Sequence, residues 1–189
     1  MEIDRGVGHH VNVADGVPKA MRVVIGVMFM TAFVLIAWAL IVRYAGGWGV
    51  PYFSFTTERG SSCTNDLTGY TCTTMSLADI EFYGEVDLPA GTKVLKSRYR
   101  STHDYQLEAT LQVPKAGAAA ALKGLAESFG PCQPNHLAPM PTTGLTSVCI
   151  MANDDAITRD ADTSGRLYNV GTGIRKDGTR TIVMTIKSR

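Results

Sequence analysis

The chain has 189 residues, and its 18 basic and 17 acidic side chains leave a net charge of only +1. From Gly46 onward the two signs balance at 14 each. Binding to nucleic acid through its phosphates needs an excess of positive charge on the binding face, so this balance argues against a nucleic-acid partner. The composition is typical of a folded chain, without low-complexity tracts or internal repeats.

Residues 23–42 form the longest apolar segment, with no charge and a single hydroxyl, that of Thr31. A helix rises about 1.5 Å per residue, so a segment of this length would cover about 30 Å, the thickness of the hydrocarbon core of a bilayer. The segment therefore predicts one transmembrane helix, preceded by a tail of residues 1–22. A cleaved signal peptide is the alternative interpretation, but its apolar core is usually only about 7–15 residues long.

Two observations predict that the tail lies in the cytoplasm and the rest of the chain outside it. Positive residues near a span are retained on the cytoplasmic side. Lys19 and Arg22 flank its N-terminal end, with Arg5 further out, against Arg43 and Arg59 on the other side, which is a modest bias. All four cysteines follow the span, and disulfides form in oxidising compartments. The lipid bilayer is thus an expected partner, and the cell membrane the expected location.

The four cysteines can pair in three ways. We expect the two local bonds, Cys63 with Cys72 and Cys132 with Cys149, because the first pair encloses a turn-rich segment and the second a proline-rich loop. Each bond would stabilise a loop with little apolar surface to bury, by about 2–3 kcal/mol in the chain-entropy model. A zinc site of Cys132, His136 and Cys149 is the alternative, which requires reduced thiols and a fourth ligand.

Residues 43–60 form a juxtamembrane linker rich in glycine and aromatic residues. Amphipathic rings prefer the membrane–water interface, so the simplest interpretation is an aromatic belt. The same rings could instead contact a transmembrane helix of a partner, or belong to the first strand of the folded domain. The four side chains concerned are Trp48, Tyr52, Phe53 and Phe55.

Residues 61–189 predict one extracytoplasmic α+β domain. Apolar and polar side chains alternate along 105–113, which indicates a strand with one face on a core and the other in water. Apolar side chains at helical spacing along 118–129, between Pro114 and Gly130, indicate one amphipathic helix. We expect an antiparallel sheet of about five to six strands with this helix packed on it. The other predicted strands are Ile80–Val86, Thr92–Arg100, Leu145–Met151, Tyr168–Ile174 and Ile182–Ile186.

Lys96, Arg98 and Arg100 fall on one face of the second predicted strand. With Lys93 they predict an interface, because near-surface cations attract anionic lipid headgroups or acidic envelope polymers, each contributing about 1 kcal/mol. The alternative is an ordinary solvated strand face that neighbouring carboxylates neutralise. The carboxylates in question are those of Glu81, Glu85 and Glu108.

A calcium hypothesis rests on Asp160, Asp162 and Ser164, which are followed by a glycine. Oxygen ligands at alternate positions and a glycine for the sharp bend resemble the first part of an EF-hand loop. The resemblance ends at the twelfth position, where Gly171 stands in place of a bidentate glutamate. A polar turn before the last hairpin is the alternative interpretation.

We expect neither catalysis nor a cofactor. The chain has no nucleophile elbow, zinc-protease helix or phosphate loop, and only His103 and His136 could serve as imidazole bases in the domain. The expected function is binding or assembly, as an accessory subunit that docks to a membrane or envelope protein. The alternative is an extracytoplasmic sensor or binding domain for a small ligand, calcium or an anionic envelope polymer. The glycine- and alanine-rich usage and the short tail are similar in style to small single-pass bacterial envelope proteins.

Overall fold

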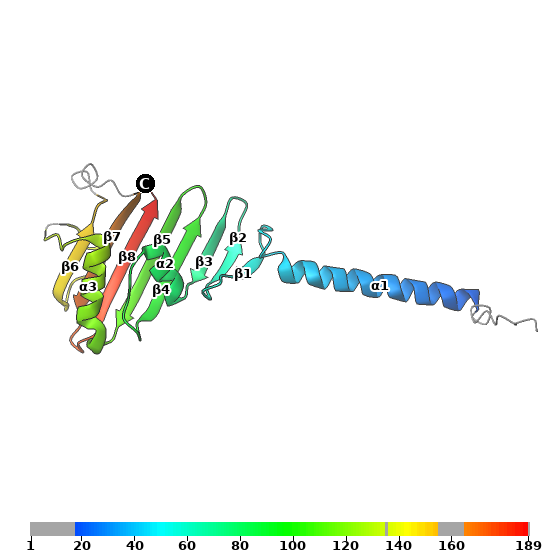
Figure 1. Ribbon diagram of the computed structural model, residues 1–189, viewed down its shortest axis with the longest axis horizontal. Coiled ribbons are helices and arrows are strands. Elements are labelled where there is room, and N and C mark those ends of the chain that lie inside the picture. Colours follow the sequence, from blue (N-terminus) through cyan, green and yellow to red (C-terminus); the bar gives the residue numbers. More distant parts are fainter. Residues whose placement is uncertain (1–17, 135, 155–164, 189) are drawn as a thin grey trace, which may run out of the picture. The chain divides into compact units, whose positions relative to one another are not determined.

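The computed structural model describes residues 18–134, 136–154 and 165–188. The chain forms two compact units, of which the first ends at Arg43 and the second begins at Tyr44. Helix α1 (Lys19–Tyr44) accounts for almost all of the described part of the first unit, and the second is a sheet with two α-helices (Figure 1).

Helix α1 contains the whole predicted span. It is 26 residues long, and none of its side chains is buried within the chain. Its most apolar window has a mean hydropathy of 2.6, so by length and composition it could be a membrane anchor or a signal sequence. The hydroxyl of Thr31 donates a hydrogen bond to the carbonyl oxygen of Val27 at 2.9 Å. The hydroxyl in the apolar segment is thus satisfied inside the helix, as a lipid environment requires.

The second unit is built on one antiparallel sheet of eight strands, in the order β1-β2-β3-β4-β5-β8-β7-β6. The predicted α+β class is confirmed, but the expected count of five to six strands is wrong. The unexpected strands are β1–β3, which are rich in serine and threonine and only 3 to 5 residues long, so no alternation of apolar residues reveals them. The strands are β1 (Ser54–Thr56), β2 (Ser62–Asn65), β3 (Tyr70–Thr74), β4 (Lys93–Ser101), β5 (Tyr105–Val113), β6 (Thr146–Ala152), β7 (Arg166–Ile174) and β8 (Arg180–Ser188).

The predicted strand Ile80–Val86 is wrong, because helix α2 occupies Leu77–Gly84. Ser76 is the N-cap, and its hydroxyl accepts a hydrogen bond from the amide of Asp79 at 3.1 Å. Glu85 ends the helix in the left-handed conformation, with a φ of 50°. The Ser-x-x-Asp spacing is a helix-start signal, which competes in the sequence with an alternation of apolar residues over the same segment.

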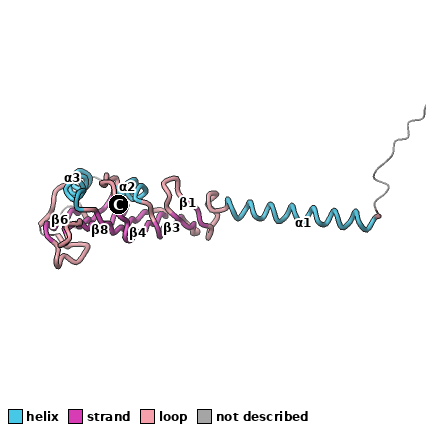
Figure 2. Tube along the Cα trace, turned by 90° about the horizontal axis from the view of Figure 1, so that it is seen from below, coloured by secondary structure: helices cyan, strands magenta, loops and turns pink. Residues whose placement is uncertain are grey.

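Helix α3 (Ala118–Phe129) confirms the predicted helix, and a short 3-10 turn, η2 (Lys115–Gly117), leads into it. Helices α2 and α3 lie on the same face of the sheet (Figures 1 and 2). The small side chain of Ala121 is fully buried, which indicates close packing of α3 on the sheet. The largest buried apolar side chains of this core are Ile80, Leu107, Leu111, Val113, Leu125, Met151, Val170, Ile182, Met184 and Ile186.

A buried carboxylate ties helix α2 to the turn between β1 and β2. One oxygen of Asp79 accepts hydrogen bonds from the hydroxyls of Thr57 and Ser76 and from the amide of Ser61. Burial alone would raise the pKa of Asp79, but these hydrogen bonds favour its charged form and hold the pKa below its usual value. The network therefore fixes α2 beside the short strands at this end of the sheet.

An aromatic cluster fills the core between α2 and strands β1, β3 and β4. Tyr83 stacks on Tyr99 with ring centroids 4.1 Å apart, and Tyr70 contacts Phe55 edge-on at 5.5 Å. Burial, with a smaller contribution from Tyr70, raises the pKa of Tyr99 to about 12. Phe55 is thus a core residue of the first strand, as one of the interpretations of the juxtamembrane rings proposed.

Both preferred disulfides are confirmed. Cys63 bonds to Cys72 directly across the β2–β3 pair, and Cys132 bonds to Cys149 of β6. All four cysteines of the chain are therefore oxidised. No thiolate remains for the alternative zinc site, which is incompatible with this bonding.

Candidate binding face of the sheet

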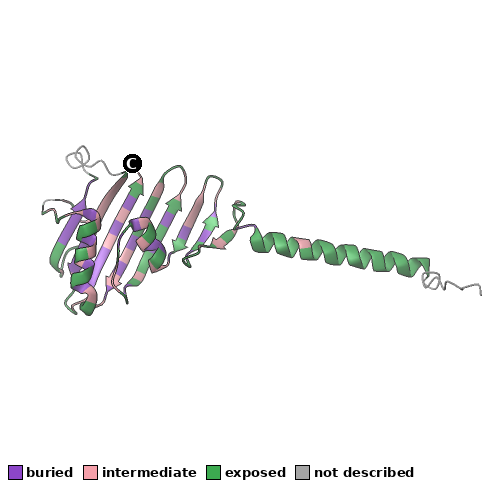
Figure 3. Cartoon of the chain, viewed as in Figure 1, coloured by how far each residue is buried: buried purple, intermediate pink, exposed green. Residues whose placement is uncertain are grey.

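Strands β4, β5 and β8 present a polar surface on the side opposite helices α2 and α3, which we call the open face. Along β4, the exposed Arg98 and Arg100 alternate with the buried Ser97 and Tyr99, because successive side chains of a strand point to opposite faces (Figure 3). The antiparallel register aligns the polar positions of the three strands. The open face comprises Lys93, Lys96, Arg98 and Arg100 of β4, Gln106, Glu108, Thr110 and Gln112 of β5, and Thr181, Val183, Thr185 and Lys187 of β8.

Charge is unevenly distributed over these twelve residues, which include five cations and only one carboxylate, Glu108. Glu108 lies opposite Arg98 in the register, yet one of its oxygens accepts a hydrogen bond from the side-chain amide of Gln106 at 2.7 Å. Among the residues that the structure describes, the cations of the open face form no ion pair. We call four of these cations, Lys96, Arg98, Arg100 and Lys187, the basic stripe.

Two of the carboxylates expected to neutralise the stripe belong to the other side of the sheet. Glu81 of α2 accepts a hydrogen bond from the amide of Leu88 at 3.0 Å. Glu85 forms an ion pair with Arg166 at 3.1 Å, and Arg166 also donates to carbonyl oxygens of the α2 and α3 segments. Of the three carboxylates considered, only Glu108 lies beside the stripe.

A loop of residues 136–145, which we call the proline loop, covers part of the sheet next to the open face. A Cβ atom at Gly171 of β7 would lie only 2.8 Å from Pro139 Cδ, and one at Gly173 only 3.0 Å from Leu145 Cδ1. Glycine at these two positions therefore permits the loop to approach the strand this closely. The Cys132–Cys149 bond holds the chain just before the loop to β6.

Four shallow depressions adjoin one another on this side of the sheet. The largest, about 650 Å³, lies between the proline loop and strands β5 and β8, and Met140 and Leu145 contribute to its apolar wall. The others, of about 170, 100 and 290 Å³, follow one another along β4 and β5. Each shares lining residues with the next, and we call this row of adjoining depressions the trough. The shared residues are, in order, Thr110 and Val183, then Arg98 and Glu108, then Arg100 and Gln106.

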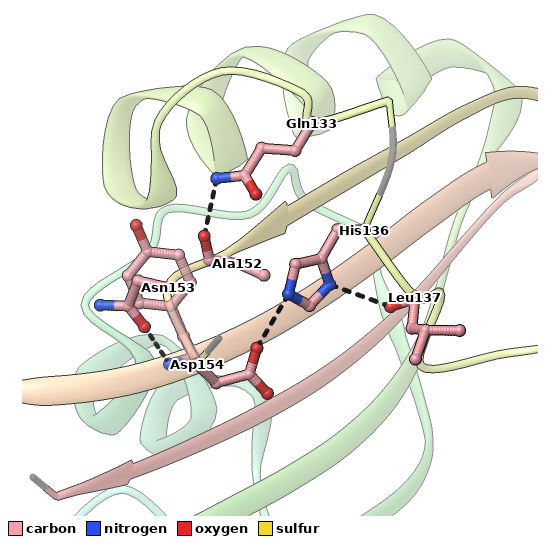
Figure 4. Close-up of polar contacts among 7 residues, drawn as sticks. Gln133, His136, Leu137, Ala152, Asn153 and Asp154 are labelled. Carbon is pink, nitrogen blue, oxygen red and sulfur yellow. Dashed lines mark hydrogen bonds and ion pairs between the residues drawn. The ribbon is translucent and has the colours of Figure 1, made fainter. Parts of the chain in front are cut away.

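His136, considered as a zinc ligand and as a base, contacts a carboxylate at the start of the proline loop. Its Nε2 lies 3.2 Å from Asp154 Oδ1, and its Nδ1 lies 3.2 Å from the carbonyl oxygen of Leu137 (Figure 4). Gln133 donates from its side chain to the carbonyl oxygen of Ala152 at 2.7 Å. These contacts attach the chain to the end of β6, the outermost strand, and shield part of its edge from pairing with another chain.

The juxtamembrane aromatic residues divide between different environments. Trp48 and Tyr52 are exposed, at 68% and 75%, and are the two that could act as interfacial rings. Phe53 and Phe55 are both half-buried, and Phe55 packs against the core of the sheet. The structure therefore separates these two members of the predicted group from the exposed pair.

Asn65 of β2 holds the segment between Tyr44 and β1 against the sheet. Its side-chain nitrogen donates to the carbonyl oxygen of Gly46 at 2.7 Å and to that of Val50 at 3.2 Å. The backbone oxygen of Asn65 also accepts a hydrogen bond from the amide of Tyr52 at 2.8 Å. This segment is thus folded onto the second unit through a residue that the sequence analysis did not single out.

The calcium hypothesis falls outside the described residues, since Asp160, Asp162 and Ser164 all belong to the segment 155–164. Within the described ranges, no three histidine, cysteine, aspartate or glutamate side chains are grouped so that they could hold a metal ion. His103, the other histidine of interest, is exposed at the β4–β5 turn.

The comparisons with known proteins give no match. No protein-family model, curated protein or solved structure is found to match this chain. The functional argument therefore depends on the chemistry of the open face and on the properties of helix α1.

Proposed function

We propose that this chain is a single-pass membrane protein whose second unit lies outside the cytoplasm and docks to a membrane or envelope protein through the open face. Its task is binding or assembly, as an accessory subunit. The observation that carries the proposal is the basic stripe, whose exposed cations lack ion-pair partners among the described residues although the chain as a whole is nearly neutral. A surface with one sign of charge steers association with a partner of the opposite sign and suppresses wrong partners.

Three features support the proposed topology. The side chains of helix α1 are exposed within the chain, which suits contact with lipid. Lys19 and Arg22 precede the apolar segment and favour retention of the N-terminus in the cytoplasm. The two disulfides fit an oxidising compartment on the other side. Protease added to intact cells should therefore digest the second unit, whereas an epitope tag on the N-terminus should be lost only after the membrane is permeabilised.

Site-specific photo-crosslinking in native membranes tests the docking face. A photoreactive amino acid at Gln106, which is exposed and lies opposite Arg100 of the neighbouring strand, should give one adduct of defined mass. The matched control carries the same group at Lys123 of α3, which is exposed on the helix-covered side and forms an ion pair with Glu127 at 3.7 Å. The control should give no such adduct.

A charge variant provides the second arm of this experiment. R98Q/R100Q should remove the adduct formed from Gln106, because the steering charge is lost while both side chains remain solvated. Substitution of two exposed lysines elsewhere, K115Q/K123Q, should leave the adduct unchanged. Equal adducts from the open face and from α3, or an adduct that survives R98Q/R100Q, would overturn the proposed docking face.

A further inference from the structure

Resting on the function proposed above, we propose that the trough binds an extended acidic peptide segment of the partner, with carboxylates at alternate positions and an apolar side chain beyond them. The carboxylates would lie over the basic stripe, and the apolar side chain would enter the depression beside the proline loop. Spacing, charge and the order of the depressions each support this occupant.

The spacing of the cations along β4 matches that of an extended peptide. Lys96, Arg98 and Arg100 occupy alternate positions after the irregularity between Val94 and Lys96, so they point to the same face. Alternate residues of a strand lie about 6.6–6.8 Å apart. A bound peptide in the same conformation has the same repeat, so carboxylates at every second residue can each face one cation. Consecutive carboxylates would point to opposite sides and could not.

Hydrogen-bonding side chains lie in the same row as the stripe. Gln106 of β5 and Lys187 of β8 continue the row of Arg100, whereas the hydroxyl of Thr71, opposite Arg100 on β3, already donates to a carboxylate oxygen of Asp66 at 3.5 Å. The guanidinium groups can bind carboxylates in a bidentate manner, which is a more directional contact than that of an ammonium group. The row therefore offers both charge and donors to an extended chain.

The largest depression lies at one end of the trough, which gives the ligand a direction. Its apolar wall comes from the proline loop and from Val183 of β8, and Arg175 and Lys176 line its rim. Through Thr110 and Val183 it continues into the depression at Lys96. A volume of about 650 Å³ is large enough for an apolar side chain with its flanking backbone. Basic residues lie on both sides of this depression, so they favour acidic residues on either side of the apolar side chain that enters it.

Two other anionic occupants fit the open face less well. Proteins that bind single-stranded nucleic acid stack its bases on aromatic side chains, and none of the twelve residues of the open face is aromatic. Surfaces that lie on anionic lipid insert aromatic and apolar side chains beside their cations. The exposed rings in the described part of this unit lie elsewhere: Tyr44, Trp48 and Tyr52 precede β1, and Phe82 belongs to helix α2 on the other face of the sheet.

The test uses the full chain in non-ionic detergent micelles and dye-labelled peptides, with fluorescence anisotropy as the measurement. The first peptide has a leucine followed by three glutamates separated by threonines, and its isomer has the same composition with the three glutamates consecutive. We expect the alternating peptide to bind at least about threefold more tightly than the isomer, because only its carboxylates share one side. A third peptide with glutamine in place of glutamate should not bind measurably.

The variants identify the site. R98Q/R100Q should weaken binding of the alternating peptide about threefold to tenfold, as expected for the loss of two exposed charge contacts. The melting temperature of this variant should match that of the wild-type protein. K115Q/K123Q should bind like the wild type. Equal affinity of the two peptide isomers, or full binding by R98Q/R100Q, would overturn the inference.

A lipid competitor tests whether the open face binds an anionic lipid headgroup rather than an acidic peptide. Monomeric short-chain phosphatidylglycerol that displaces the peptide at a lower concentration than the unlabelled peptide itself would replace this inference with a headgroup site. If the peptide isomers bind equally but the crosslink from Gln106 persists in native membranes, the inference fails and the proposed docking function stands. Loss of the crosslink as well would refute both.

Discussion

Removal of the Asn65 side chain tests how firmly the segment between Tyr44 and β1 is held against the sheet. Asn65 is only 6% exposed, and its amide donates at 2.7 Å and 3.2 Å to the carbonyl oxygens of Gly46 and Val50. In Asn65→Ala both hydrogen bonds are lost, while the carbonyl oxygen of Gly46 keeps the hydrogen bond that it accepts from the amide of Gly49 at 3.1 Å. Each bond that is lost contributes about 1 kcal/mol to stability.

We therefore expect Asn65→Ala to destabilise the second unit by about 2 kcal/mol, which lowers the melting temperature by about 4–8 °C for a unit of this size. Differential scanning of the full chain in detergent measures this shift. Amide hydrogen exchange should also increase locally at Val50 and Tyr52, whose segment the side chain holds in place.

The matched control is Thr64→Ala, in the same strand, whose exposed hydroxyl lies 3.0 Å from that of Ser54. It should change stability by less than about 0.5 kcal/mol, as is usual for surface positions. If the two variants melt within about 1 °C of each other and the exchange rates of Val50 and Tyr52 are unchanged, Asn65 does not hold the segment and the reasoning is refuted.

Three further variants test the carboxylate network, the proline loop and its disulfide. Asp79→Asn should lower the free energy of unfolding by about 2 kcal/mol at neutral pH. The pKa of Asp79 is lower in the folded chain than in the unfolded one, so the difference in stability between variant and wild type should narrow as the pH falls below 3.8. Chemical denaturation measures this difference, and a constant value would contradict the prediction. Gly171→Ala should lower the free energy of unfolding by about 1–3 kcal/mol, because the added methyl group overpacks the contact with the proline loop. Gly165→Ala, where an added Cβ meets no described atom within 4 Å, should leave the melting temperature almost unchanged. Equal shifts in melting temperature would refute the close approach of the loop. Replacing Cys132 and Cys149 by alanine should lower the free energy of unfolding by about 3 kcal/mol. If a reductant lowers the melting temperature of this variant as much as that of the wild type, the loss of this bond is not the cause of the destabilisation.

Local signals in the sequence were sufficient for the elements with a clear period. Strand β5 and helix α3 have the predicted bounds, since an alternation over 105–113 and a 3.6-residue period over 118–129 each leave one conformation that buries the apolar side chains. The same reasoning misassigned α2, where the cap at Ser76 overrides a short alternation. Both disulfides were predicted correctly because each closes a short loop.

The open face could be identified only from the tertiary structure. The sequence places Lys96, Arg98 and Arg100 on one side of β4, but it does not say that Lys187, which is remote in the chain, continues their row across β8. Equally, it does not say that Glu81 and Glu85 lie on the helix-covered side, where they cannot neutralise the stripe.

The sequence by itself determined the apolar helix, the pairing of the cysteines and the α+β class, because each depends on residues close together in the chain. Only the tertiary structure decided the count and order of the strands, the position of the proline loop over Gly171, and the trough that results. These features depend on pairing between distant segments, and in a sheet a shift of one residue in register moves every side chain to the opposite face.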